Sequence, residues 1–362
     1  MGNIAKRDNG QWRARYRDDL GKEHARHFDT KTDAQRWLDS VTSSRVTGSY
    51  VDPHAGKITF AEWWDEWSQR QVWARGTVLS ANIAAKSVTF ADLPLNSIKR
   101  SHVEQWIATL IKSGQKPSTV TLKYVHVNHA FRAAVQDRLI QHNPAEGVTL
   151  PRAERRELAM KIPTPEQVAA LINSADPEFA AFLSLLAFAG LRVGEACGVQ
   201  VGDIDWMRRK INIVRQVQYL GAAGVDIKEP KDGSARTIPL PDSLINILSR
   251  QVRNNPRVTD WLFFGQHQAT TTENWKRTAK RAGVDGFTPH SLRHFYASGL
   301  IASGADVVTV QRAMGHSSAT ITLNTYAHLW PTAEDRTRSA AAELMASVQD
   351  ARVVAKTAYA GS

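Results

Sequence analysis

The amino-acid sequence predicts a multidomain α+β protein. Its 362 residues exceed the usual size of one hydrophobic core, so two or three domains are expected. A segment near the N-terminus alternates with period two, a middle segment has only helical periodicity, and the last part mixes apolar helices with short strand-like runs. We therefore expect a small N-terminal β-sheet/helix domain, an all-α middle domain, and a mainly-α C-terminal domain with a small antiparallel sheet.

The expected boundaries follow breaker residues and changes in composition. Val46–Gly56 carries the turn residues of a linker, and Thr149–Pro165 is charged and bracketed by prolines. The resulting segments are residues 1–55 (first domain and its linker), 56–150 (middle domain), 151–162 (interdomain linker), 163–345 (C-terminal domain) and 346–362 (C-terminal tail).

Charge and cysteine content narrow the class of protein. The formal net charge of +11 favours a polyanionic partner, most commonly nucleic acid, although a basic enzyme without such a partner also fits. A single cysteine, Cys197, excludes an intramolecular disulfide and a Cys-rich metal site. The N-terminus has no secretory h-region and no apolar run could span a bilayer, so we expect a cytoplasmic protein.

The first domain is expected to present a basic sheet face. Trp12–Tyr16 alternates as a strand does, His24–Phe28 forms a second short strand, and a helix capped by Thr30 or Thr32 follows. Such a face can enter a DNA groove, although a solvated basic surface fits the same pattern. The side chains expected on it are Arg13, Arg15, Arg17 and Arg26.

The middle domain is expected to be entirely helical. Thr59 caps a helix whose Phe60, Trp63, Trp64 and Trp67 fall on one stripe, which favours a core over a base-stacking platform. Further helices are expected over Ser101–Ser113 and Ser118–Gln136. The basic residues available for DNA phosphates are Lys112, Lys116, Lys123 and Arg132.

The C-terminal domain contains charged residues in unusual places. Arg192 interrupts an apolar helix expected over Phe179–Val199, and Glu195 follows three residues later. A buried Arg is rare unless it is paired or bound to an anion, so an ion pair and an anion site both remain open. Ile211–Val217 reads as a strand, and Val225–Lys228 and Arg236–Leu240 bracket a hairpin-like element with Lys231 near its tip. A solvated lysine without a special role is the alternative interpretation of Lys231, because lysines at exposed tips are usually solvated.

The last part of this domain places polar groups at helix ends. Thr288 caps a helix in which His290 and Arg293 share one face, at positions i and i+3. A second helix, Asp306–Met314, ends at Gly315, and His316 follows at once. Tyr326 lies one short helix further on.

These residues resemble the motif set of a known family. Arg192, Lys231, His290-x-x-Arg293, Gly315-His316 and Tyr326, in that order, resemble the tyrosine recombinases, and among them the phage integrases of the lambda type with an N-terminal arm-binding domain. AGLRVGEACGV, PHSLRHFYAS and GHSSATITLNTYAHL resemble the two signature boxes of the family. The resemblance is close from Ile162 to about Leu329, whereas the preceding segments match only the layout.

The resemblance implies a site-specific DNA recombinase of a phage or mobile element. Such an enzyme integrates and excises DNA at attachment sites through a 3′-phosphotyrosyl intermediate and a Holliday junction, without a metal or cofactor. The implied partners are double-stranded DNA with core-type and arm-type sites, three further copies of the chain in a homotetramer, a host DNA-bending protein and an excisionase. The implied location is the bacterial host cell, at the nucleoid. The resemblance also implies cleavage in cis and a tail that docks on a neighbouring subunit.

The chemistry assigns a role to each matching residue. Tyr326 is the expected nucleophile, because a phenolate is a reasonable leaving group and makes the step reversible. Arg192 and Arg293 would stabilise charge on the phosphate, with Glu195 as a support for Arg192. Lys231 is the implied general acid for the 5′ oxygen. The resemblance further implies that His316 donates to the phosphate and that His290 assists proton movement.

Several alternatives stay open at this stage. Lys228 competes with Lys231, although Pro230-Lys231 fits the family pattern better, and Tyr296 is the rival nucleophile. A metal triad of His290, His294 and His316 is disfavoured because the arginines would repel a cation. A catalytically inactive DNA-binding regulator, a conjugative-transposon integrase and a relaxing topoisomerase are the alternative functions. The segment before Tyr326 is expected to be mobile and partly exposed, with the tyrosine not deeply packed.

Overall fold

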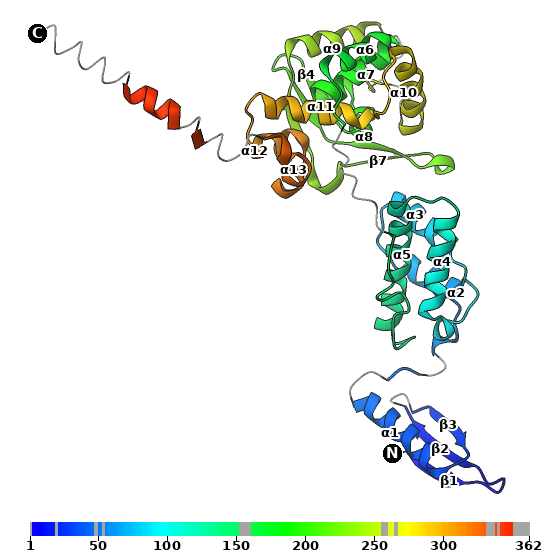
Figure 1. Cartoon of the computed structure of the whole chain (residues 1–362). Coiled ribbons are helices and arrows are strands. Elements are labelled where there is room, and N and C mark those ends of the chain that lie inside the picture. The colour runs from blue at the N-terminus through cyan, green and yellow to red at the C-terminus, as the bar shows by residue number, and fades with distance from the viewer. Residues whose placement is uncertain are drawn as a thin grey trace, which may run out of the picture. The chain divides into compact units, whose positions relative to one another are not determined.

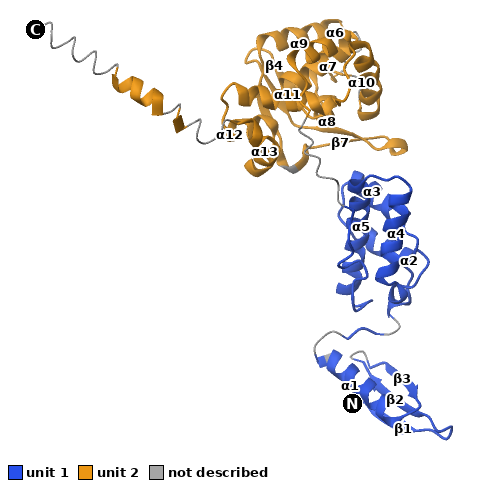
Figure 2. Cartoon of the chain, viewed as in Figure 1, with its two compact units in different colours: residues 1–156 blue, residues 157–362 orange. Residues whose placement is uncertain are grey.

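The structure is a computed structural model of the whole chain (Figure 1). It describes residues 2–18, 21–46, 50–52, 55–151, 161–254, 260–263, 267–330, 337–338 and 341–349. The chain divides into two compact units, residues 1–156 and 157–362 (Figure 2). Most of the predicted linker 151–162 lies outside the described residues, as do parts of the first linker and the tail from residue 350 onward.

The N-terminal sheet has three antiparallel strands in the order β1-β2-β3, with helix α1 on one face. The bounds are Asn3–Lys6 for β1, Trp12–Arg17 for β2, Glu23–Phe28 for β3 and Lys31–Val46 for α1. Strands β2 and β3 lie where the alternation predicts them, whereas β1 is an additional strand. The Thr30 hydroxyl accepts from the Asp33 N–H at 3.1 Å, so Thr30 rather than Thr32 precedes the helix. Ala14, Tyr16 and Leu38 form the core beneath α1.

The second part of the first unit is a bundle of four α-helices, as the periodicity predicts. Their bounds are Phe60–Gln69 for α2, Arg75–Ala85 for α3, Arg100–Lys112 for α4 and Pro117–Gln136 for α5. Thr59 and Glu62 form a reciprocal capping box at the start of α2, which satisfies two backbone donors. Trp63 is buried and its indole N–H donates to the Ala130 carbonyl at 2.9 Å. The tryptophan stripe is therefore a core, as expected.

Over its described residues, the second unit is mainly helical with two small antiparallel sheets. Its helices are α6 Pro165–Ser174, α7 Pro177–Phe188, α8 Val193–Cys197, α9 Asp242–Asn254, α10 Gln268–Ala282, α11 Pro289–Ala302, α12 Val307–Met314 and α13 Ala319–Tyr326. Its strands are β4 Ile204–Asp205, β5 Lys210–Ile213, β6 Gln216–Tyr219, β7 Val225–Lys228 and β8 Arg236–Pro239. Helix α7 is almost wholly buried, and α6, α9 and α11 pack around it. The predicted α+β class is confirmed.

The two sheets correct the predicted hairpin around Lys231. β5 pairs with β4 and β8, whereas β6 pairs with β7, so β7 and β8 belong to different sheets. The expected strand Ile211–Val217 breaks because Arg215 turns inward, where its guanidinium contacts the Asp203 carboxylate and donates to the Gly198 carbonyl. Lys231 consequently lies on a crossover between the sheets, in a short 3-10 turn.

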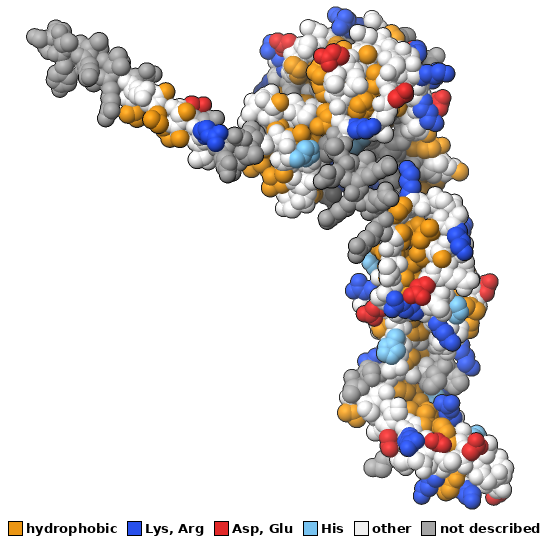
Figure 3. Space-filling model, viewed as in Figure 1, with side chains coloured by type: hydrophobic (Ala, Val, Ile, Leu, Met, Phe, Trp, Pro, Cys, Tyr) orange, Lys and Arg blue, Asp and Glu red, His pale blue; other side chains and the backbone are white. Residues whose placement is uncertain are grey.

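The end of the chain contains a further helical segment. Residues 341–349 are helical, and hydrophobic side chains lie on the surface of this segment (Figure 3). The exposed ones are Leu344, Met345 and Val348. In the part of the chain that the structure describes, no helix combines the length and the apolar character that crossing a bilayer requires.

Candidate active site

Arg192 stands at a break in the apolar region rather than inside a helix. The expected single helix Phe179–Val199 is divided into α7 and α8, because Gly190 turns the chain with a φ of 64°. Arg192 is therefore the residue that precedes α8, and its side chain is half-buried. Its Nη1 donates to Glu195 Oε1 at 2.7 Å, and its backbone N–H donates to Glu195 Oε2 at 2.9 Å.

Glu195 is the buried anion of the site. Its carboxylate contacts Arg192, accepts from Arg236 Nη2 at 2.9 Å, and lies 3.9 Å from Arg293 Nη1. Burial alone would raise the pKa of this carboxyl, but the hydrogen bond and charge of Arg236, with the charge of Arg293, lower the pKa to about 2. Glu195 therefore supports three arginines, where the sequence indicated one.

Arg293 occupies the centre of this cluster. Its side chain is 2% exposed, and its guanidinium donates to the backbone carbonyls of Gly190 and Met314. Burial and the neighbouring Arg192 lower the pKa of Arg293 to about 9, so the side chain stays charged at neutral pH. His290, one turn earlier on α11, is exposed. The predicted shared face of His290 and Arg293 thus runs from the surface into the core.

His316 is fixed by the turn at the end of α12. Gly315 adopts the left-handed conformation (φ 60°, ψ 49°), and the His316 N–H donates to the Gln311 carbonyl at 3.1 Å. His316 Nδ1 lies 2.8 Å from the Thr322 hydroxyl. Burial and the charges of the three arginines lower the pKa of His316 to about 4, so the ring is neutral at pH 7. A neutral imidazole next to arginines can still donate one N–H to a phosphate.

Tyr326 is buried, contrary to the expectation of a loosely packed nucleophile. It is 1% exposed and packs in a cluster with Ile301, Val310 and Met314. The preceding segment is helix α13 rather than an irregular spacer. Burial raises the pKa of Tyr326 to about 12, against a small lowering by Arg293. Its local sequence is apolar at Ile321 and Leu323 but polar elsewhere, which concealed how deeply the tyrosine packs.

The hydrogen-bond partner of Tyr326 is His294, which sequence reasoning did not assign to the site. His294 Nδ1 lies 2.7 Å from the Tyr326 hydroxyl. Burial and the nearby His290, whose ring centroid is 4.7 Å away, lower the pKa of His294 to about 4. His294 follows His290 by four residues, so the helical spacing alone places both rings on one side of α11. That spacing was the available signal.

The two lysine candidates differ in their surroundings. Lys228 Nζ lies 2.5 Å from Gln218 Oε1 and 3.9 Å from Asp226 Oδ2. Lys231 is exposed, and the turn that carries it ends at Ser234, whose hydroxyl lies 3.4 Å from Arg192 Nη1. The chain thus brings the Lys231 segment to the arginine cluster and leaves Lys228 bonded elsewhere.

The rival tyrosine has a different role in packing. Tyr296 is half-buried on α11, and its ring lies where a side chain on Gly190 would be, with 2.3 Å from an added Cβ to Tyr296 Cδ1. Burial raises its pKa. Tyr296 therefore helps to shape the break between α7 and α8.

One of the predicted basic residues of the N-terminal sheet lies on the wrong face. Arg13, Arg15 and Arg17 alternate with the buried Ala14 and Tyr16, so they share the outer face. Arg26 pairs across the strands with Ala14, and paired residues point to the same side, which puts Arg26 on the α1 side. The outer face also carries Glu23, whose carboxylate lies 3.1, 3.7 and 4.0 Å from the three arginines. Figure 3 shows acidic and basic side chains intermingled on this domain.

The four basic residues of the helical module do not form one surface. Lys112 ends α4 and Lys116 immediately precedes α5, where both are exposed. Lys123 and Arg132 are both on α5, but nine residues correspond to about 180° around a helix. One phosphate-facing surface can therefore include Lys123 or Arg132, not both.

Metal-like spacing occurs in the first compact unit of the chain. Within the described ranges, one group of ligand-type side chains lies close enough to share an ion: Asp18, His24 and Asp52, in the N-terminal part. Lys22 Nζ is 3.1 Å from Asp52 and already supplies a cation there. The histidines around Tyr326 do not form such a group among those residues.

The chain is similar to known proteins in sequence and in fold. The profile of the Phage integrase family matches residues 162–332, and that of the phage integrase N-terminal domain matches residues 1–48. A tyrosine recombinase of Thermosipho africanus is 30% identical over 260 residues, which cover 67% of this chain and 85% of that protein. A putative prophage phiRv2 integrase of Mycobacterium tuberculosis is 26% identical and covers 95% of both chains. The lambda integrase in a tetramer bound to a Holliday junction has a similar fold, with a TM-score of 0.61 at 18% identity over 91% of this chain and 95% of that one.

Proposed function

The chain belongs to the tyrosine recombinases, and on that premise we propose how its own residues carry out the reaction and which DNA it joins. It is a site-specific recombinase that cleaves and rejoins DNA strands through a 3′-phosphotyrosyl intermediate and a Holliday junction. The observation that carries the residue assignments is the convergence of Arg192 and Arg293 on Glu195, with His316 and Tyr326 beside them.

The arginines are proposed to bind the scissile phosphate. Attack on a phosphodiester puts extra charge on the non-bridging oxygens, and fixed guanidinium donors stabilise that charge without reorganisation. Arg192 has the more exposed guanidinium and would make the direct contact, while Arg293 adds positive charge from beneath. We assign no metal or cofactor to the reaction, since these two cations supply the charge that phosphate chemistry requires.

Tyr326 is proposed to attack after leaving its resting place. The Oη–P bond forms as the P–O5′ bond breaks, the phenol proton passes to a neighbouring base, and Lys231 gives a proton to the departing 5′ oxygen. His290 remains the proposed base, and His316 the proposed donor to the phosphate. Because Tyr326 is buried and bonded to His294 in this structure, α13 has to move before the hydroxyl reaches a phosphate.

The DNA partner is bound, in our proposal, by all three parts of the chain. The N-terminal sheet takes arm-type sites through Arg13, Arg15 and Arg17, and the helical module and the catalytic domain take the core-type site. Lys112, Lys116 and either Lys123 or Arg132 would contact core-site phosphates. This division makes the protein a phage or mobile-element integrase, acting at the nucleoid in the cytoplasm of a bacterial host.

Assembly on DNA is proposed to use the end of the chain. The helix at residues 341–349 exposes Leu344, Met345 and Val348, which a neighbouring subunit would cover in a homotetramer. Integration and excision at two kinds of site would further require a host DNA-bending protein and an excisionase to set direction.

The arm-site assignment can be tested in the full-length chain. We expect simultaneous Arg13→Gln, Arg15→Gln and Arg17→Gln substitutions to abolish recombination between full attachment sites but to preserve cleavage of an isolated core site. The slope of log affinity for arm-site DNA against log salt should fall by about 1 for each lost phosphate contact. Arg26→Gln is the matched control, because this arginine is on the other face of the sheet. Equal recombination by the triple variant and the wild type would refute the arm-site assignment.

A further inference from the structure

The C-terminal end of α12 is held by three arginines at three consecutive carbonyls. Each carbonyl accepts from a different guanidinium. The Ala313 carbonyl accepts from Arg236 at 2.9 Å, the Met314 carbonyl from Arg293, and the Gly315 carbonyl from Arg192 at 3.1 Å. All three guanidiniums also contact the Glu195 carboxylate. One of these arginines, Arg236, has no role in the reaction described so far.

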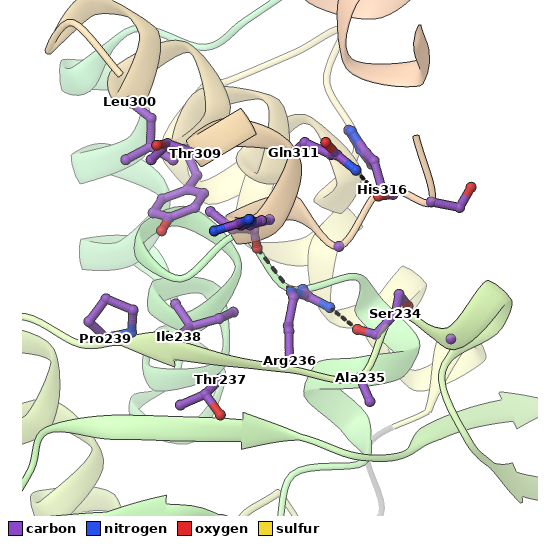
Figure 4. Close-up of a pocket in the computed structure, with 16 residues that line it drawn as sticks. Ser234, Ala235, Arg236, Thr237, Ile238, Pro239, Leu300, Thr309, Gln311 and His316 are labelled. Carbon is purple, nitrogen blue, oxygen red and sulfur yellow. Dashed lines mark hydrogen bonds between the residues drawn. The ribbon is translucent and has the colours of Figure 1, made fainter. Parts of the chain in front are cut away.

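Four of the five N–H donors of Arg236 are bonded to groups of the protein itself. The Arg236 side chain is 8% exposed, and its Nε donates to the Ala313 carbonyl. Its Nη1 donates to Glu195 Oε1 and to the Ser234 carbonyl, both at 3.2 Å, and its Nη2 donates to Glu195 Oε2 at 2.9 Å. Figure 4 shows the bond from Arg236 to Ser234. A guanidinium bonded in this way does not present its fork to a phosphate, so a direct catalytic role is excluded.

The contacts of Arg236 join three segments that carry reacting groups. Glu195 supports Arg192, Ser234 closes the turn that carries Lys231, and the end of α12 leads directly into His316. Along the chain, Glu195 is 41 residues from Arg236 and Ala313, at the end of α12, is 77 residues from it. Ser234 belongs to the loop that leads into Arg236. The same residue therefore sets the relative positions of the phosphate donors and the proposed general acid.

The turn after α12 is shaped to admit this side chain. A Cβ added to Gly315 would lie 2.8 Å from Arg236 Nη1, and the backbone there is left-handed. A side chain at position 315 would push the guanidinium away from Glu195. Gly315 thus serves the approach of Arg236 as well as the end of the helix.

We propose that Arg236 is a positioning residue for strand cleavage, which keeps Glu195, Arg192 and His316 in place when Tyr326 moves to attack. The inference rests on the proposed catalytic roles of those residues. α13 must move with Tyr326, whereas the turn that begins it has to remain fixed because it carries His316. Three arginine–carbonyl bonds at residues 313–315 hold the fixed end. Arg236 also bonds the backbone carbonyl of Ser234 in the Lys231 segment, whereas Arg192 meets only the Ser234 hydroxyl.

Arg236→Lys tests the proposal with the charge retained. A lysine ammonium cannot reproduce the planar fork that bonds both carboxylate oxygens and two carbonyls. We expect the full-length variant to fold and to bind core-site DNA as the wild type does. Its single-turnover cleavage of a nicked core-site substrate should be about 10- to 100-fold slower, as a misplacement near 1 Å implies. Arg208→Lys, at an exposed arginine 3.7 Å from Asp205, controls for the exchange itself.

A second variant provides a readout that a purely structural residue would not change. Arg236→Gln removes the charge that lowers the pKa of Glu195, so cleavage should acquire a new acid limb that the wild type lacks. Wild-type cleavage rates in folded Arg236→Lys protein, with an unaltered pH profile in Arg236→Gln, would overturn the proposal. An Arg236→Lys protein that fails to fold would also overturn it, because the residue would then serve the fold alone. If the wild type itself forms no covalent adduct, the proposed function fails instead.

Discussion

The hydrogen bond between His294 and Tyr326 leads to a prediction about release of the nucleophile. The two side chains meet at 2.7 Å in a site where Tyr326 is 1% exposed. Replacing His294 with Phe keeps a ring of similar size but removes the partner of the buried hydroxyl. We expect the variant to favour the state in which α13 has left its resting place.

The size of the effect follows from the cost of an unsatisfied buried hydroxyl. Leaving such a group without a partner costs about 1–3 kcal/mol, which corresponds to about a 5- to 150-fold shift in the equilibrium. Hydrogen exchange of the amides of α13, followed by mass spectrometry, measures this shift as faster exchange. His328→Phe, at an exposed histidine just after the helix, is the matched control.

A double-mutant cycle separates this bond from general loosening of α11. In a Tyr326→Phe background the hydroxyl is absent, so His294→Phe should accelerate exchange much less than it does in the wild type. Equal acceleration in both backgrounds, or none in the single variant, would refute the idea that His294 holds the nucleophile at rest.

Three further predictions concern the acid, the break after α7 and pH. Lys231→Ala should lose about 10²–10⁴-fold in cleavage rate. A substrate with sulfur in place of the 5′ bridging oxygen should largely restore the rate, because a thiolate leaves without protonation. Equal defects on both substrates would exclude Lys231 as the acid. Gly190→Ala should lower the melting temperature by several degrees in thermal unfolding, since the added Cβ would lie 2.3 Å from the Tyr296 ring at a left-handed φ of 64°; an unchanged melting temperature would contradict this. The folded-state pKa values of His316 (about 4) and Glu195 (about 2) lie below their ordinary values near 6.5 and 4.5, so the unfolded state binds more protons and stability should fall as pH drops from about 6.5 towards 2. The free energy of unfolding, measured with denaturant at each pH, should depend less steeply on pH below 6.5 in His316→Gln than in the wild type. An identical pH dependence in both proteins would contradict the assignment.

The α+β class could be predicted from the sequence because short-range signals carry it, whereas the family could be predicted from the order of the motif residues between Arg192 and Tyr326. Thr59 caps its helix, Gly315 ends α12, and the tryptophan stripe forms a core where helical periodicity places it. Each of these features depends on residues within about one turn of each other. Such patterns survive in the sequence and need no knowledge of distant contacts.

The structural predictions from the sequence were wrong where a contact between residues far apart in the chain decides the structure. The strand around Val214 breaks because Arg215 reaches Asp203, and the helix before Arg192 breaks at Gly190, against which Tyr296 packs. The placement of Arg26 required the register of β2 and β3, which alternation in one strand does not supply.

The same limit applies to the candidate site. Arg236 looked like an ordinary basic residue at the start of a strand, and its role depends on bonds to residues 41 and 77 positions away. The depth of Tyr326 depends on Ile301 and Val310, from two other helices. Residue identity and order predict which groups react, and that prediction is still to be tested, whereas the contacts of those groups became visible only in three dimensions.

The most direct measurement is the identity of the residue that becomes bonded to DNA. A core-site substrate nicked near the cleavage position traps the covalent intermediate, and peptide mapping by mass spectrometry then locates the nucleotide adduct. We predict an adduct on Tyr326 in the wild type and none in Tyr326→Phe. An adduct on Tyr296, or one that persists in Tyr326→Phe, would contradict the account.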